Sequence, residues 1–166
     1  ITEPTILAIT STQKNAGCNG AADGTAKVKV TGGFGAYKYS WAPSGGIADS
    51  ASGLVAGTYT VTVTDGYSCE KTHIITITEP AVLSANRTKT DVLCNGDSTG
   101  VAIVTPIGGT PPYTYSWNPP YIDTDSTLTG LPAGTYICTI TDAHNCTYQT
   151  TVVIAQPSLL TASVTH

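Results

Sequence analysis

The feature that most constrains this sequence is an internal duplication. Cys18-Asn19-Gly20 recurs as Cys94-Asn95-Gly96, so the residue numbers differ by 76. Later in the repeat they differ by 77, since Tyr59 corresponds to Tyr136, and one insertion therefore lies between the two motifs. A period of this length indicates two copies of one folding unit. The other matching segments are Tyr37-Lys38-Tyr39-Ser40-Trp41 with Tyr113-Thr114-Tyr115-Ser116-Trp117, and Ala56-Gly57-Thr58 with Ala133-Gly134-Thr135.

The ends of the copies are marked by a short motif. Glu3-Pro4 matches Glu79-Pro80 and Gln156-Pro157. We therefore expect an excised piece of a longer tandem array. Proline restricts its own backbone and that of the preceding residue, and no Gly or Ser run interrupts the junction, so a stiff joint is predicted. The expected divisions are the tail of a preceding repeat at 1–4, repeat one at 5–80, repeat two at 81–157 and the start of a following repeat at 158–166.

Composition and residue alternation predict an all-β fold. The chain has 17 Gly and 10 Pro, and Thr recurs at alternate positions through most apolar segments, a pattern typical of strands separated by turns. No segment shows the apolar spacing of a helix. The strands expected in the first copy are 5–12, 25–31, 36–42, a short one within 47–53, 57–65 and 71–78, with the second copy following at the stated offsets.

Alternation also assigns the inward faces, because side chains two residues apart share one side of a strand. The Tyr of each Ala-Gly-Thr-Tyr motif is placed to bond its hydroxyl to backbone upstream, as in the tyrosine corner of immunoglobulin-like domains. We therefore predict two tandem immunoglobulin-like β-sandwich domains. The expected core is Ala26, Val28, Val30, Tyr37, Tyr39, Trp41, Tyr59, Val61, Val63, Ile75 and Ile77, and in copy two Tyr113, Tyr115, Trp117, Tyr136, Cys138, Ile140, Val152 and Ile154.

Charge and hydropathy argue against several function classes. The net charge is -4 and the seven Lys and Arg residues are scattered, so no nucleic-acid partner is expected. No apolar run reaches 18 residues, so no direct membrane insertion is expected. The three His residues lack a repeated nucleophile beside them, and the chain is predicted to be neither an enzyme nor a cofactor-binding protein. These residues are His73, His144 and His166.

At this point the motifs resemble a known family, the SprB repeat. The resemblance rests on Cys18 to Asp23-Gly24, Gly32-Gly33, Tyr37 to Trp41, Ala56 to Tyr59, Thr64-Asp65, and Cys69 to Glu79-Pro80. Copy two carries the family's Gly-Gly-x-Pro-Pro-Tyr at residues 108–113, whereas copy one departs from it at residues 32–37. The resemblance implies type IX secretion, an extracellular position on the cell surface associated with the outer membrane, and a role in gliding motility. It also implies neighbouring repeats of the same chain as partners, with surface polysaccharide or substratum as further partners.

The five cysteines suggest a disulfide framework. Our leading hypothesis pairs Cys18 with Cys69 and Cys94 with Cys146, each closing a loop within one copy. In a seven-strand sandwich these loops would lie at opposite poles, so pairing within a copy needs a strand count or loop path that brings both to one pole. The rival scheme pairs Cys18 with Cys146 and leaves Cys69 and Cys94 for flanking repeats. Cys138 aligns with the core residue Val61 and is interpreted as a buried free thiol.

Several surface residues are candidates for binding or modification. No metal site is predicted, and the oxygens of Asn19, Asp23, Asp123 and Asp125 are the candidate calcium ligands, at a density below that of a twelve-residue calcium loop. Ser50, Ser98 and Ser126 each follow Asp and are candidates for O-glycosylation. A more apolar outward face in copy two is a possible contact surface, formed by Val101, Ile103 and Ile107 together with Tyr121 in the loop that carries the insertion.

The function predicted from the sequence is architectural, namely a repeat that spaces and displays adhesive regions of a long secreted surface filament. One alternative is a carbohydrate-binding module, which requires exposed coplanar aromatic rings. Burial of Tyr37, Tyr39, Trp41 and their counterparts would count against it. Another alternative is an accessory domain of a secreted hydrolase, which requires a catalytic domain elsewhere in the parent chain.

Overall fold

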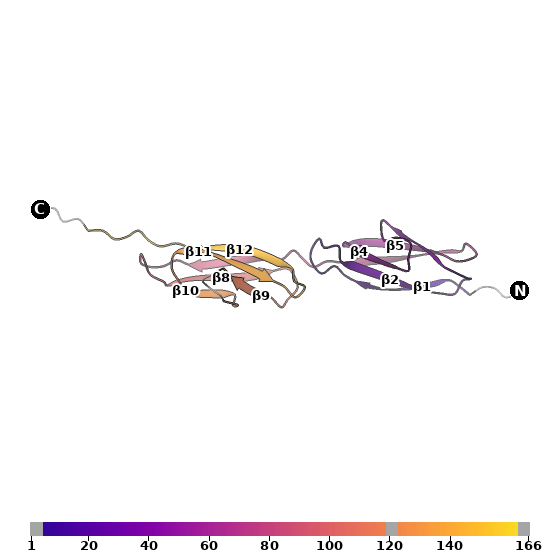
Figure 1. The fold of residues 1–166 in the computed structure, drawn as a ribbon, viewed down its shortest axis with the longest axis horizontal. Coiled ribbons are helices and arrows are strands. Elements are labelled where there is room, and N and C mark those ends of the chain that lie inside the picture. Colours follow the sequence, from indigo (N-terminus) through magenta and orange to yellow (C-terminus); the bar gives the residue numbers. More distant parts are fainter. Residues whose placement is uncertain (1–4, 119–122, 163–166) are drawn as a thin grey trace. The chain divides into compact units, whose positions relative to one another are not determined.

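All regular structure is β-strand in the computed structural model, which describes residues 5–118 and 123–162 (Figure 1). The chain divides into two compact units, Ile1–Pro80 and Ala81–His166. Each unit holds six strands in two three-stranded antiparallel sheets. The prediction of an all-β chain is therefore confirmed. No helix within the described ranges is long and apolar enough to cross a membrane.

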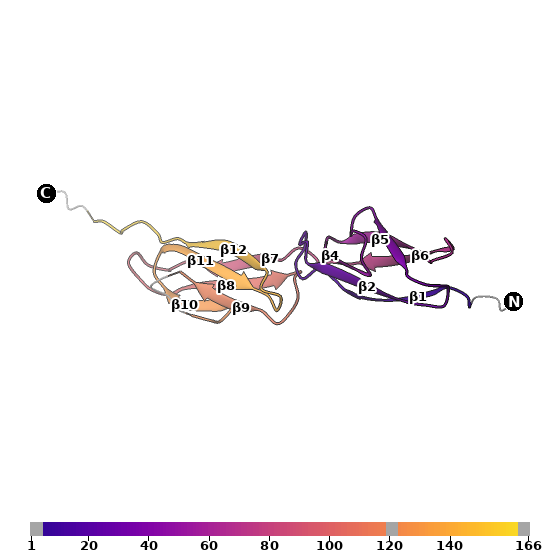
Figure 2. The ribbon, with the colours of Figure 1, turned by 45° about the vertical axis from the view of Figure 1, so that its right-hand side comes forward.

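In the first unit, the sheets have the strand orders β1-β2-β4 and β3-β5-β6 (Figure 2). The six predicted strands all form, but the first begins three residues later than expected. Its first residues are instead used to fasten the arriving chain, since the carbonyl of Thr5 accepts the N–H of Gly33. The strands are β1 (Ala8–Lys14), β2 (Gly24–Thr31), β3 (Lys38–Ala42), β4 (Ser50–Leu54), β5 (Gly57–Thr64) and β6 (Glu70–Ile77).

The second unit repeats this topology, with the sheets β7-β8-β10 and β9-β11-β12. Both units correspond to an immunoglobulin-like sandwich that keeps the A-B-E and C-F-G sheets. The strands are β7 (Ser84–Thr90), β8 (Gly100–Ile107), β9 (Thr114–Trp117), β10 (Thr127–Leu131), β11 (Gly134–Thr141) and β12 (Thr147–Ile154).

A tightly packed glycine begins the second strand of each copy. A Cβ on Gly24 would lie 2.7 Å from the carbonyl oxygen of Leu54, and a Cβ on Gly100 would lie 2.7 Å from that of Leu131. The pairing register between neighbouring strands also shifts beside both glycines. Only glycine lets the two backbones approach this closely.

The core of each unit is centred on one tryptophan. Trp41 and Trp117 are buried, and each indole N–H donates to a carbonyl, that of Ala48 and that of Asp125 respectively, at 2.9 Å in both cases. Buried Trp N–H groups need such a partner. The expected inward faces are confirmed, although Val30, Tyr37, Tyr39 and their tyrosine counterparts are half-buried. The buried set further includes Ala51, Leu54, Leu83, Val92, Ala102, Val104, Leu128 and Leu131.

The tyrosine corner is present in both units. The hydroxyl of Tyr59 donates to the carbonyl of Val55 at 3.0 Å, and that of Tyr136 donates to the carbonyl of Pro132 at 2.7 Å. Each bond spans four residues upstream, as in immunoglobulin-like domains. The predicted fold class is therefore confirmed.

Each sandwich has two poles. We call the one where the chain arrives the leading pole, formed in the first unit by the β2–β3 loop and the β5–β6 hairpin, which meet through the N–H of Gly66 and the carbonyl of Phe34. The chain departs at the trailing pole, where the β1–β2 loop meets the end of β6 through the N–H of Ala16 and the carbonyl of Thr78. The chain therefore crosses each domain from one pole to the other.

Candidate functional site

The Cys-Asn-Gly motif lies at the trailing pole and holds the departing chain. In the first unit, the side-chain amide of Asn19 donates to the Glu79 carboxylate at 2.9 Å and to the Pro80 carbonyl at 3.1 Å. The N–H of Gly20 donates to the other Glu79 oxygen at 2.6 Å. The motif is thus a clamp on the Glu-Pro dipeptide that closes the repeat.

The same clamp recurs in the second unit with a neutral acceptor. The amide of Asn95 donates to the Pro157 carbonyl at 3.0 Å, and the N–H of Gly96 donates to the side-chain oxygen of Gln156 at 3.0 Å. Because Glu and Gln both accept here, the clamp depends on hydrogen bonding and not on charge. The sequence marked Glu-Pro and Gln-Pro only as boundaries, and their role as the clamped residues was missed.

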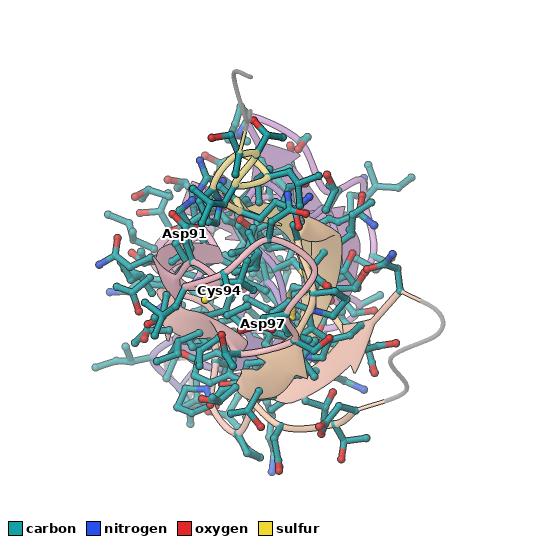
Figure 3. All side chains as sticks on the ribbon, turned by 90° about the vertical axis from the view of Figure 1, so that its left-hand side faces the viewer. Asp91, Cys94 and Asp97 are labelled. Atoms are coloured by element: carbon teal, nitrogen blue, oxygen red, sulfur yellow. The ribbon has the colours of Figure 1, made fainter. Side chains whose placement is uncertain are left out.

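Asp91 adds a further contact at the trailing pole of the second unit, where Figure 3 shows it with Cys94 and Asp97. Its carboxylate accepts the N–H of Ala155 and the ammonium of Lys89, both at 2.8 Å. The hydrogen bond from Lys89 makes the largest contribution to lowering the pKa of Asp91, and the hydrogen bond from the backbone of Ala155 lowers it further. In the first unit Asn15 has the same position and accepts the N–H of Thr78 at 3.1 Å.

A buried aspartate organises the leading pole of the first unit. Asp65 is 6% exposed and accepts three backbone N–H groups, those of Phe34, Tyr67 and Cys69, at 2.9 to 3.0 Å. The hydrogen bond from Cys69 makes the largest contribution to lowering the pKa of Asp65, and those from Phe34 and Tyr67 lower it further. Burial acts in the opposite direction. The carboxylate thereby joins the β2–β3 loop to the β5–β6 hairpin.

Asp142 does the same in the second unit, where it is 5% exposed and accepts the N–H groups of Thr110, His144 and Cys146, each at 2.9 Å. Burial by itself raises the pKa of Asp142, but these three bonds and the charge of His144 together lower it. The aspartate of each unit thus holds its own hairpin turn and the neighbouring loop together.

The leading pole also holds the arriving chain. The N–H of Gly33 donates to the Thr5 carbonyl at 2.8 Å, and that of Gly109 donates to the Ala81 carbonyl at 2.9 Å. The Pro80 carbonyl is bonded by the first domain and the Ala81 carbonyl by the second, so two consecutive residues are fastened to different domains. No unanchored residue separates these two points.

The cysteines contradict the leading disulfide hypothesis. Cys69 and Cys94 are free and exposed, so the pairs Cys18–Cys69 and Cys94–Cys146 do not form. The reason is the distance between poles, since β5 has eight residues and spans about 26 Å, whereas disulfide Cα atoms lie about 4.4 to 6.8 Å apart. Cys18 and Cys146 are disulfide-bonded. Of the two schemes left open by the sequence, the rival one has Cys69 and Cys94 unpaired, as found.

Cys138 is a free thiol with no exposed surface, in agreement with its interpretation as a core residue. Burial raises its pKa to about 11, although a backbone hydrogen bond from Ser116 acts in the other direction. Such a thiol stays protonated at neutral pH, where only the thiolate is a nucleophile. Its position in the core is that of a small apolar residue.

Most aromatic side chains in the described part of the chain lie in or against the cores. Trp41 and Trp117 are buried and the tyrosines beside them are half-buried, which counts against the carbohydrate-binding alternative. One exposed pair was missed by the sequence analysis. Phe34 and Tyr67 stack at the leading pole of the first unit with ring centroids 4.2 Å apart and planes at 17°. Copy two has Thr110 and His144 at these positions, so the duplication gave no signal for the pair.

The candidate calcium ligands have other partners in the structure. Asn19 belongs to the clamp, and Asp23 accepts the N–H of Gly17 at 2.9 Å and lies 3.9 Å from the Lys14 ammonium. Asp123 accepts the N–H of Asp125 at 3.0 Å. Within residues 5–118 and 123–162, no group of three or more His, Cys, Asp or Glu side chains is placed to hold a metal ion.

The candidate modification and contact residues lie at the surface. Ser50 and Ser98 are exposed and Ser126 is half-buried, and their glycosylation stays a prediction. Ile103 and Ile107 are 37% and 47% exposed on the outer face of β8, where Val101 is half-buried. Tyr121, the fourth residue of that proposed surface, lies outside the described residues.

The histidines are placed for structural contacts. His73 Nε2 lies 2.9 Å from the hydroxyl oxygen of Ser11, which joins β6 to β1 across the two sheets. In the second unit, Arg87 on β7 donates to the Thr150 hydroxyl on β12 at 3.3 Å. Arg87 corresponds to Ser11 in the repeat, and Thr150 corresponds to His73. Because a different pair of residues makes the same link in the second unit, the histidine pair of the first unit is interpreted as a link between sheets. His144 is exposed in its hairpin, and His166 lies outside the described residues.

Comparison with known proteins bears on the resemblance found in the sequence. The family model of the SprB repeat matches residues 10–48 and residues 86–120, one segment in each copy, which confirms the resemblance. The match supports an adhesin-type repeat module and a non-catalytic structural domain. It also suggests a position on the cell surface. No curated protein matches the chain.

Among solved structures, the chain is similar to the N-terminal eight Ig domains of Down Syndrome Cell Adhesion Molecule isoform 1.30.30. The identity is 13%, with 93% of this chain and 25% of that one covered and a TM-score of 0.45. A C-terminal 282-residue fragment of intimin, in complex with the intimin-binding domain of the translocated intimin receptor, is 13% identical, with 92% and 64% covered and a TM-score of 0.44. Domains IG1 and IG2 of DIP-gamma are 13% identical, with 90% and 97% covered and a TM-score of 0.40. The chain thus covers a quarter of the length of the first of these structures and just under two thirds of the second. Similarity at this level does not extend to function.

Proposed function

We propose that this chain is a load-bearing spacer module of a cell-surface adhesin, which displays adhesive regions along a long filament. The supporting observation is the way in which the chain is fastened at both poles of both domains. Pro80 is held by the clamp of the first domain and Ala81 by the leading pole of the second. A spacer requires such a chain path, because each module then adds a fixed length with no slack between modules.

The resemblance to the SprB repeat gives this spacer its setting. The parent protein is exported by the type IX secretion system, is displayed at the outer membrane and moves along the cell during gliding. Its other partners are neighbouring repeats and a polysaccharide or solid substratum. The modules described here contribute length and stiffness, and the gripping surface lies elsewhere in the filament.

The chain path also determines how force passes through a module. Tension between the ends pulls β1 at the leading pole and β6 at the trailing pole, so it acts along the strands and shears their contacts. The bonds from Asn19 and Gly20 to Glu79 and Pro80 lie on this path, as does the bond between Ala16 and Thr78. Bonds loaded in shear must break together, which favours all-or-none unfolding.

Single-molecule force spectroscopy in a reducing buffer tests the proposal. We expect two discrete unfolding events of similar contour length, since a copy of about 76 residues at about 3.5 Å per residue lengthens by roughly 24 nm once its folded length is subtracted. Asn19→Ala should lower the unfolding force of one event, while Asn86→Ala, an exposed change on β7, should alter neither. Gradual lengthening at low force, without two discrete events, would refute a load-bearing role.

A further inference from the structure

The two copies offer an internal comparison of the loop that carries the first cysteine. The carbonyl of Cys18 accepts the N–H of Ala21 at 3.1 Å, and the carbonyl of Cys94 accepts the N–H of Asp97 at 3.2 Å. Both loops therefore hold their cysteine in the same turn. Cys18 is disulfide-bonded, whereas Cys94 is a free and exposed thiol (Figure 3).

The hairpin that carries the second cysteine shows the same contrast. The N–H groups of Cys69 and Cys146 each donate to the aspartate of the leading pole at 2.9 Å, and the carbonyl of each accepts that aspartate's N–H at 3.0 Å. The residue before each cysteine has a φ of 65°. Cys146 is disulfide-bonded, whereas Cys69 is free and exposed. The two bonded cysteines are thus one loop cysteine, Cys18, and one hairpin cysteine, Cys146. The two exposed free cysteines are likewise one of each kind.

Exposed apolar side chains lie near both free cysteines. Beside Cys69, the stacked rings of Phe34 and Tyr67 are 52% and 62% exposed. Beside Cys94, Leu93 is 81% exposed, and it shares a concave surface with Leu159. Surface of this kind marks a contact site, because docking removes it from water. The apolar concavity beside one thiol suits the aromatic pair beside the other.

From these observations we infer that Cys69 and Cys94 are cross-linking sites for further copies of this module, with a hairpin cysteine of one copy bonding to a loop cysteine of the other. The leading pole of the first domain receives a trailing pole, and the trailing pole of the second domain receives a leading pole. The inference goes beyond a spacer role, which requires no covalent bond between chains or further modules.

The chemistry is a two-electron oxidation of two thiols. Glutathione disulfide, as the oxidant, is attacked by the thiolate of one cysteine, which forms a mixed disulfide and releases one glutathione thiol. The thiolate of the partner cysteine then attacks the protein sulfur of the mixed disulfide and releases the second glutathione. Two protein thiols and one glutathione disulfide thus give one protein disulfide and two glutathione thiols.

The test uses two complementary variants of the full chain, Cys69→Ser and Cys94→Ser, in a glutathione redox buffer at high protein concentration. Each variant keeps one exposed thiol, and Cys18, Cys138 and Cys146 are unchanged. Non-reducing electrophoresis should show each variant alone as a monomer and the equal mixture as a dimer, with at least tenfold more dimer in the mixture. The unchanged chain should form a ladder of oligomers, and peptide mapping should identify Cys69 linked to Cys94.

Two outcomes would overturn the inference. One is a mixture that stays monomeric, and the other is dimerisation of either single variant alone as readily as the mixture, which would indicate unselective oxidation of surface thiols. Because both changes are on exposed side chains, the variants are expected to fold, and unchanged near-ultraviolet circular dichroism checks this. Force spectroscopy in reducing buffer does not depend on these thiols, so failure here leaves the spacer proposal separately testable.

Discussion

Replacement of Asp142 by Asn should strongly destabilise the second domain. One carboxylate oxygen accepts the N–H groups of His144 and Cys146, and the other accepts that of Thr110, all at 2.9 Å. An amide has a single oxygen, and its NH2 group would face a backbone donor. At least one buried N–H therefore loses its acceptor in Asp142→Asn.

The size of the effect follows from the bonds that are lost. A hydrogen bond to a charged group contributes about 1.5 to 3 kcal/mol, and an unpaired buried donor adds about 1 kcal/mol, so the free energy of unfolding should fall by about 2 to 4 kcal/mol. For a domain of this size that lowers the Tm by roughly 10 to 25 °C. Asp97→Asn is the matched control, because Asp97 is exposed in the same domain and its change should cost less than about 0.5 kcal/mol.

The pH dependence distinguishes a charged acceptor from a packing effect. The pKa of Asp142 is lowered in the folded state, so its stabilisation is complete above the unfolded value of about 3.9 and is lost as the pH falls through the folded pKa. Denaturant unfolding followed by hydrogen exchange of peptides from each domain should show a large difference between the unchanged chain and Asp142→Asn at pH 7. That difference should shrink towards zero in strong acid. A loss no larger than that of the control, or one independent of pH, would refute the reasoning.

Three other substitutions test the packing of the domains. Cys138→Val should change the free energy of unfolding by less than about 1 kcal/mol in denaturant titration, because Val61 fills the equivalent site, and a large loss would contradict the assignment of this thiol to the apolar core. Tyr136→Phe should cost about 0.5 to 1.5 kcal/mol by the same assay through loss of the 2.7 Å tyrosine-corner bond, and an unchanged midpoint would show that this bond does not stabilise the fold. Gly100→Ala should lower the Tm by several degrees in calorimetry, since its Cβ would lie 2.7 Å from a backbone carbonyl, and normal stability would mean that the strand can shift without cost.

Alternation along the strands predicted most of the fold. Every second residue of β5 and β11, starting from Tyr59 and Tyr136, was assigned to the core because a strand places alternate side chains on one face. The start of the first strand was misplaced because the carbonyl of Thr5 is bonded to Gly33 in the β2–β3 loop, and strand propensity carries no information about such a bond. The exposed ring pair of Phe34 and Tyr67 was missed for the same reason, since 31 to 33 residues separate the hairpin and the loop that meet at the leading pole.

The disulfide error has a different origin. Cys18 and Cys69 of one copy correspond to Cys94 and Cys146 of the other, and this correspondence is satisfied by pairing within a copy and equally by pairing between successive copies. A periodic sequence cannot distinguish these two schemes. The contacts of the two loops do so, because the Cys18 loop meets the end of β6 at the trailing pole, whereas the Cys69 hairpin meets the β2–β3 loop at the leading pole.

The features that the two copies share bear on what the module does. The aspartate at the leading pole, the Asn-Gly clamp at the trailing pole and the tyrosine corner make equivalent bonds in both domains. The outward side chains differ, since Ile103 takes the place of Lys27 and Thr110 the place of Phe34. A module that recognised one ligand on its flank would need the same outward chemistry in each copy. What recurs instead is the set of bonds that fasten the chain where it arrives and departs, so the shared task of the two copies is to carry the chain from pole to pole.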